Sequence, residues 1–224
     1  NEDKDREKPD TSIRDGVNKA CITTRARRTV RPFPFLSDTT IVGAALWQLR
    51  WPLTRGCNML LTDNDRNALE ACDENGITNV GRIFALLDNF VEEGVQQGRF
   101  SREEADADLE IALWRSFALL QCDDYASYAQ AVEVLQKAEA AAAGSGVWHY
   151  RLAAALTHVG RLREAFDIAR RGVEAEPGYP WGWLHYAKLL AHFGETEAAQ
   201  AAVQRGLELV PGDAEFLTCL LYTS

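Results

Sequence analysis

The stretch that decides the fold is residues 146–211, GVWHYRLAAALTHVGRLREAFDIARRGVEAEPGYPWGWLHYAKLLAHFGETEAAQAAVQRGLELVP. One pattern occurs twice within it, at a spacing of 34 residues. Five pairs of identical residues carry this spacing: Gly160 and Gly194, Ala165 and Ala199, Gly172 and Gly206, Glu174 and Glu208, Pro177 and Pro211. A period of this length is typical of arrays of helical hairpins.

Each of the two units divides into two helical segments. Apolar residues recur at helical spacing up to the first glycine of the unit, and again from there to the proline. Gly160 and Pro177 end the two segments of the first unit, and Gly194 and Pro211 end those of the second. Glycine or proline just beyond a helix is the expected stop signal. The stretch therefore predicts two consecutive helix–turn–helix hairpins.

Small residues recur inside the predicted helices. Gly172 and Gly206 lie within helical runs, where each costs roughly 1 kcal/mol relative to alanine. A glycine that recurs at this cost predicts that a neighbouring backbone lies against it. Close crossings of antiparallel helices are predicted at four alanines: Ala153, Ala165, Ala187 and Ala199.

These residues resemble the tetratricopeptide repeat family. The small residues, the first glycine and the closing proline match the family, whereas Ala169 and Val203 stand where its second helix carries a large aromatic residue. The resemblance implies an all-α fold, a short antiparallel helix–turn–helix solenoid, and a function in binding. The alternative is an ordinary helical bundle whose periodicity is accidental.

A third, degenerate repeat is predicted before these two. Residues 103–121 and 128–143 read as its helices, and Ser101 with Glu104 forms a capping box at the start of the first. The turn at 122–124 lacks a glycine, and Ala143 replaces the proline. With this repeat, the predicted array of about three repeats spans residues 101–218.

Residues 59–100 are predicted to form a helical cover for the array. Asp63 or Asp65 is expected to cap a short helix over 67–72, which ends at a turn over 73–76. Thr78 or Asn79 is expected to cap a longer helix, whose apolar stripe fits packing against the first repeat.

Residues 1–58 are predicted to be a basic, largely disordered arm. They contain 11 basic and 7 acidic residues, for a net charge of +4, whereas the rest of the chain carries 13 basic and 26 acidic residues. Two interpretations remain open: a basic arm tethered to an acidic array, or a non-native stretch before the true start at Met59. A nucleic-acid contact through Arg25–Arg31 is a further hypothesis.

The last six residues, 219–224, resemble the translation of a sequencing-library adapter. This predicts a fragment assembled from environmental DNA, with an artefactual tail that we leave out of functional arguments. The alternative is a native helix end.

Composition narrows the class of protein. The net charge of −9 makes nucleic acid an unlikely general partner, because like charges repel. No apolar run reaches the ~18 residues of a membrane span. The five cysteines form no CxxC pair, which favours reduced thiols in a cytoplasmic protein.

No catalytic, metal or cofactor pattern is present, so we expect a protein that is not an enzyme. Asp63, Asp65, Asn67 and Glu74 have the spacing of a calcium-binding loop, but Ala68 occupies the position that needs glycine. Helix capping explains these residues better. The four histidines have no partners at metal-ligand spacing.

The family resemblance places the first helix of each repeat along an inner groove that binds peptides. The predicted peptide-binding residues are Tyr150, Arg151, His158, Trp181, His185, Lys188 and His192. This set suits an acidic peptide or a C-terminal carboxylate, with Arg151 and Lys188 as charge partners and Trp181 as anchor. The alternative is that Trp181 and Trp183 pack between repeats. A second function remains open: an accessory domain of an enzyme or toxin-related system.

Overall fold

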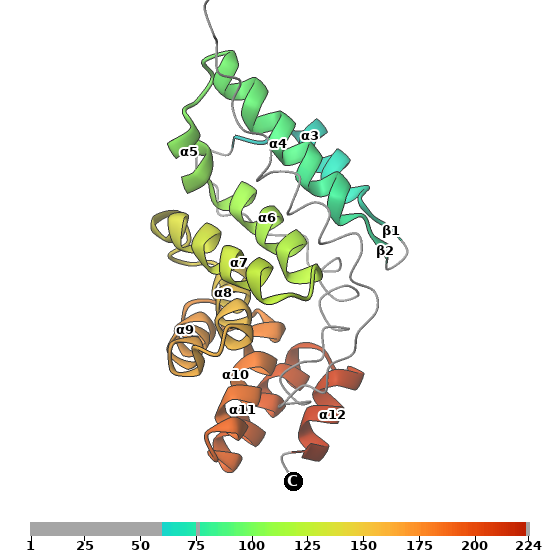
Figure 1. Ribbon diagram of the computed structural model, residues 1–224. Helices are drawn as coiled ribbons and strands as arrows, with labels where there is room; N and C mark the ends of the chain where they lie inside the picture. Colours follow the sequence, from blue (N-terminus) through green and yellow to red (C-terminus); the bar gives the residue numbers. More distant parts are fainter. Residues whose placement is uncertain (1–59, 75–76, 223–224) are drawn as a thin grey trace, which may run out of the picture. The chain divides into compact units, whose positions relative to one another are not determined.

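The structure, a computed structural model, describes residues 60–74 and 77–222 (Figure 1). The described residues are almost entirely helical, as predicted, apart from one short hairpin of two strands. The elements are α3 (Asp63–Glu70), β1 (Asp73–Glu74), β2 (Ile77–Thr78), α4 (Val80–Gln96), α5 (Arg102–Ala107), α6 (Leu109–Gln121), α7 (Tyr125–Lys137), the 3-10 helix η1 (Glu139–Ala141), α8 (Gly146–His158), α9 (Leu162–Ala175), α10 (Pro180–His192), α11 (Thr196–Leu209) and α12 (Ala214–Tyr222). The predicted arm over 1–58 lies outside the described residues.

Consecutive helices pack as hairpins that follow one another along the chain (Figure 1). The pairs α6–α7, α8–α9 and α10–α11 are the three predicted repeats. Their first helices also contact one another, because α8 packs against both α6 and α10, and α10 packs against α12. The fold is therefore all-α, with the first helices side by side. None of the described helices combines the length and apolarity needed to cross a bilayer.

The two glycine turns have the same geometry. Gly160 and Gly194 both have φ of +83°, a left-handed conformation that side chains disfavour. Just after them, the N–H groups of Arg161 and Glu195 donate to the carbonyls of Leu156 and Leu190, each at 2.9 Å. This hydrogen bond over five residues closes a helix end around a glycine. The glycine stop signals are thus confirmed in detail.

Gly172 and Gly206, the recurring glycines inside helices, lie close to side chains of neighbouring helices rather than to their backbone. A Cβ atom at Gly172 would lie 2.6 Å from Cβ of His149 on α8. At Gly206 it would lie 1.9 Å from the ring of Phe216 on α12. The predicted close approach is correct, although the expected backbone contact is wrong, since the nearest backbone atom of α8, Cα of His149, would lie 3.9 Å from a Cβ at Gly172.

The small residues at the helix crossings are fully buried. Ala153 and Ala165 on α8 and α9 have no exposed surface, and neither have Ala187 and Ala199 on α10 and α11. The residues at which the family's second helix carries a large aromatic side chain are also buried here. Ala169 is 3% exposed, and Val203 is fully buried. Smaller side chains therefore fill this position without leaving it open to solvent.

The third repeat differs from its prediction in three ways. Its first helix is broken at Asp108, whose extended backbone separates α5 from α6 and whose side chain caps α6. The second helix begins earlier, at Tyr125, because Asp124 caps it, and ends at Lys137. Asp123 takes the left-handed conformation that glycine has in the other turns, with φ of +55°. The capping box of Ser101 and Glu104 is confirmed.

The predicted cover is made of α3, the β1–β2 hairpin and α4. Thr62, rather than Asp63 or Asp65, caps α3, and Asp65 closes a capping box with it. The short helix therefore starts before residue 67. Asn79 caps α4 as predicted. Arg66 on α3 makes a two-pronged ion pair with the buried Glu110 on α6, at 2.7 and 2.9 Å.

Residues 219–222, which belong to the tail that was predicted to be an artefact, form the end of α12. Phe216 and Cys219 are buried against the last repeat, whereas Leu217 and Leu221 are exposed. The assignment of residues 219–224 as an artefact stays a prediction.

Candidate functional site: the inner face of the first helices

Four of the seven predicted binding residues are buried. Tyr150, Arg151, Trp181 and His185 expose no more than 8% of their surface. They come from α8 and α10, at positions where these helices pack against each other and against α6 and α12. The expectation of exposed aromatic side chains is therefore wrong for Tyr150 and Trp181.

Arg151 connects two repeats. Its guanidinium donates through Nη1 to the carbonyl of Leu113 on α6 and lies 5.4 Å from the ring centre of Phe117. Burial lowers its pKa to about 10, partly offset by the hydroxyls of Tyr179 and Tyr150. These contacts make Arg151 part of the packing between α6 and α8.

His185 lies in the contact between α8 and α10. Its Nε2 is 3.2 Å from Oγ1 of Thr157, and the ring of Tyr150 meets its imidazole edge-on at 5.8 Å. Burial lowers the pKa of His185 to about 3, and the charges of Lys188 and His158 add to this effect. The imidazole of His185 is therefore uncharged near neutral pH and belongs to the contact between α8 and α10.

Trp181, on α10, packs against α12. Its ring lies 5.7 Å from that of Phe216 on α12. This agrees with the alternative in which Trp181 fills the space between repeats. Trp183 differs, because it is half-buried and donates from Nε1 to the carbonyl of Pro177 at 2.9 Å.

The three remaining predicted residues reach the surface. His158 and Lys188 are half-buried and His192 is exposed. His158 stacks on the ring of Tyr128 on α7 at 4.1 Å, and the hydroxyl of Tyr128 donates to Asp123 at 2.5 Å. The predicted residues that reach the surface are therefore one lysine and two histidines, and the predicted aromatic residues are buried.

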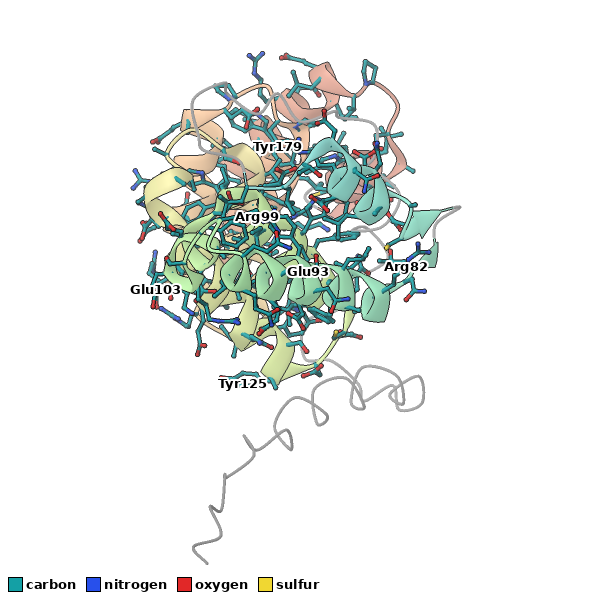
Figure 2. The ribbon with its side chains drawn as sticks, turned by 90° about the horizontal axis from the view of Figure 1, so that it is seen from above. Arg82, Glu93, Arg99, Glu103, Tyr125 and Tyr179 are labelled. Carbon is teal, nitrogen blue, oxygen red and sulfur yellow. The ribbon has the colours of Figure 1, made fainter. Side chains whose placement is uncertain are left out.

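Tyr179 is a residue of this region that the sequence prediction missed. It precedes Pro180 at the start of α10 and is buried, whereas Tyr125 is exposed and lies at the edge of the view in Figure 2. The ring of Tyr179 meets that of Tyr150 at 5.9 Å, and its buried hydroxyl makes no hydrogen bond. Burial raises its pKa well above the usual value. The sequence feature that could have pointed to Tyr179 is an aromatic residue directly before a proline that starts a helix.

Metal and thiol chemistry find little support in the part of the chain that the structure describes. Those residues contain no cluster of three or more histidine, cysteine or acidic side chains that would hold a metal ion. Cys72 and Cys219 are buried free thiols.

Part of the repeat region matches a known protein family. Residues 159–219, which span α9 to α12, match the tetratricopeptide repeat family. This part of the chain is similar to tetratricopeptide repeats.

Solved structures support the same fold over a longer stretch. The chain is similar to the MamA RS-1 ArsTM double mutant, with a TM-score of 0.52 and 19% sequence identity. The similarity covers 71% of this chain and 81% of that one. At this identity the likeness shows the fold alone. Comparison with curated proteins finds no match.

Proposed function

We propose that the chain is a non-catalytic adaptor that binds an acidic peptide, or a peptide's C-terminal carboxylate, on the inner face of α8 and α10. Tetratricopeptide repeats indicate a protein-interaction module, which supports a protein partner. The observation that carries the finer proposal is the basic surface of this face, formed by His158, Lys188 and His192. Carboxylates pair with such groups through charge-assisted hydrogen bonds.

The buried residues have a supporting role in this proposal. Tyr150, Arg151, Trp181 and His185 fix the spacing of α6, α8, α10 and α12 and so position the basic side chains above them. We propose that the module acts in the cytoplasm, that nucleic acid is not its partner, and that it needs no cofactor.

Charge reversal on the surface tests the proposal. A chain with Lys188→Glu and His192→Glu should lose binding to a short peptide of alternating glutamate and alanine, measured by fluorescence anisotropy. Arg170→Glu is the matched control, because Arg170 is exposed on α9. If the double variant binds the acidic peptide as tightly as the original chain, the proposal is wrong. Arg151→Glu is unsuitable, since it would bury a new charge.

A further inference from the structure

One buried hydroxyl between α8 and α10 is left unpaired. Tyr179 exposes 5% of its surface, and among the described residues its hydroxyl has no hydrogen-bond partner. An unpaired buried polar group costs stability, and such groups are uncommon in folded proteins. A phenylalanine would fill the same space without this cost. Packing alone therefore does not explain why a tyrosine stands at this position.

Two glycines leave room for the side chain of Tyr179. A Cβ atom at Gly146, the first residue of α8, would lie 2.9 Å from Cβ of Tyr179. A Cβ atom at Gly182 on α10 would lie 3.5 Å from Cδ1 of the same tyrosine. On a further side the ring of Tyr150 meets that of Tyr179 at 5.9 Å between centres. Neighbours on both helices therefore hold the ring, and with it the hydroxyl, in one position.

The charges around this hydroxyl favour a negatively charged ligand. Burial raises the pKa of Tyr179 well above its usual value, so the hydroxyl keeps its proton and can donate it. The guanidinium of Arg151 is near enough to act on the charge of this tyrosine. The carboxylate of Glu176 also acts on it, but accepts from the backbone N–H of Gly146 at 2.6 Å. An O–H donor beside a cationic side chain suits a carboxylate oxygen.

We propose that the hydroxyl of Tyr179 donates a hydrogen bond to a carboxylate of the bound peptide, at a polar site between α8 and α10 that is closed in the free chain. The inference rests on the proposed function and names a group that recognises the ligand. Because the hydroxyl is shut off from solvent, a neighbouring side chain must move before the carboxylate reaches it. The carboxylate is either the C-terminus of the peptide or a glutamate side chain, which present the same two oxygens.

Binding then pairs a polar group that the free chain leaves unpaired. The hydroxyl should therefore stabilise the complex and destabilise the free protein. A tyrosine with a purely structural role would not show these opposite effects.

Tyr179→Phe tests both effects, because it removes only the hydroxyl. The free variant should be at least as stable as the original chain in urea, since an unpaired buried group is gone. Its affinity for a labelled glutamate–alanine peptide, measured by fluorescence anisotropy, should fall about ten-fold through loss of one hydrogen bond to a charged group. Tyr125→Phe is the matched control and should change neither quantity, because Tyr125 is exposed and its hydroxyl can bond to water.

Two further peptides distinguish the sources of the carboxylate. One ends in a free carboxylate and has no acidic side chain, whereas the other contains glutamate and has an amidated C-terminus. A peptide whose affinity falls in the Tyr179→Phe variant carries a carboxylate that Tyr179 binds.

Three results would count against the inference. Equal affinity of the variant and the original chain for all three peptides would refute the site, although the proposed function would stand. Lower stability of the free variant would also refute it, because the hydroxyl would then have a partner in the free chain. If the original chain binds none of these peptides, the proposed function fails together with the inference.

Discussion

Two glycines set the distance between neighbouring helices. Gly172 and Gly206 each lie against a side chain so closely that a Cβ atom would overlap it, with His149 in one case and Phe216 in the other. Their recurrence in the sequence predicted the close approach. The identity of the contacting side chain could not be predicted, because His149 comes from the preceding helix and Phe216 from the following one.

Adding a methyl group at these glycines should destabilise the protein. Gly172→Ala and Gly206→Ala should each lower the free energy of unfolding by roughly 1–3 kcal/mol, because overpacking outweighs the ~1 kcal/mol gain in helix propensity. Urea denaturation measures the change. Gly178→Ala is the control, since nothing lies within 4 Å of the added Cβ there. Unchanged or higher stability in both variants would contradict the packing described.

His185 should make the fold sensitive to acid. Its folded pKa of about 3 lies below the ordinary value of 6.5, so the unfolded chain binds more protons between these values. The stability that His185 contributes is complete above about pH 6.5 and is lost progressively as the pH falls toward 3.

Replacing His185 tests this pH dependence. His185→Leu should reduce the loss of stability between about pH 7 and about pH 5, measured as the shift of the urea midpoint. Thr157 keeps a partner in this variant, because its hydroxyl donates to the carbonyl of Ala153 at 2.8 Å. Equal slopes for His185→Leu and the original chain would refute the assignment.

At the scale of elements, the small residues at the crossings are the most sensitive positions. Ala165→Leu and Ala199→Leu should each cost roughly 1–3 kcal/mol of unfolding free energy, because α8–α9 and α10–α11 leave no room for a larger side chain. Thermal unfolding followed by circular dichroism measures the change. Ala198→Leu and Ala201→Leu on the exposed side of α11 are matched controls and should change stability little.

Helices whose ends carry glycine or proline were predicted well, and those with other ends were not. The two complete repeats have glycine turns and closing prolines, and their helices begin and end near the predicted residues. The break at Asp108 was missed, because a capping aspartate inside a continuous apolar pattern also fits an unbroken helix. The left-handed conformation at Asp123 was missed because it is uncommon for residues other than glycine.

The binding site stays a prediction, whereas the burial of its residues is seen in the structure. The sequence placed these residues on the first helices of the repeats, but a residue name does not tell whether a side chain reaches solvent there. Arg151 illustrates the difficulty, since an arginine is seldom fully buried, yet it lies against Phe117 and the backbone of α6. Burial of this kind depends on neighbours that are distant in the sequence.

At the scale of the molecule, the apolar core of the described residues is in two parts. The larger extends from Leu61 through α4, α6, α7, α8 and α9 and includes Leu189 of α10, and the smaller joins α10, α11 and α12 with Tyr150 of α8. Val147, Phe166 and Tyr186 pack against both. Repeat proteins gain most of their stability from contacts between neighbours, so the smaller core should open first.

Hydrogen exchange followed by mass spectrometry tests this order. Amides of α10, α11 and α12 should exchange in a common step at lower denaturant than those of α6 and α8. The Gly206→Ala variant should speed exchange in the smaller core and leave α4 and α6 nearly unaffected. Exchange of all helices in one step would show a single cooperative unit instead.

The matching turns at Gly160 and Gly194 also determine which changes of length the chain tolerates. A block of 34 residues between them begins and ends with the same backbone geometry, so a duplicated block would join its neighbours through a connection already in use. A single residue added within a helix would instead rotate all that follows by about 100°, since a turn takes 3.6 residues. Evolution and protein engineering can therefore extend this protein in whole blocks.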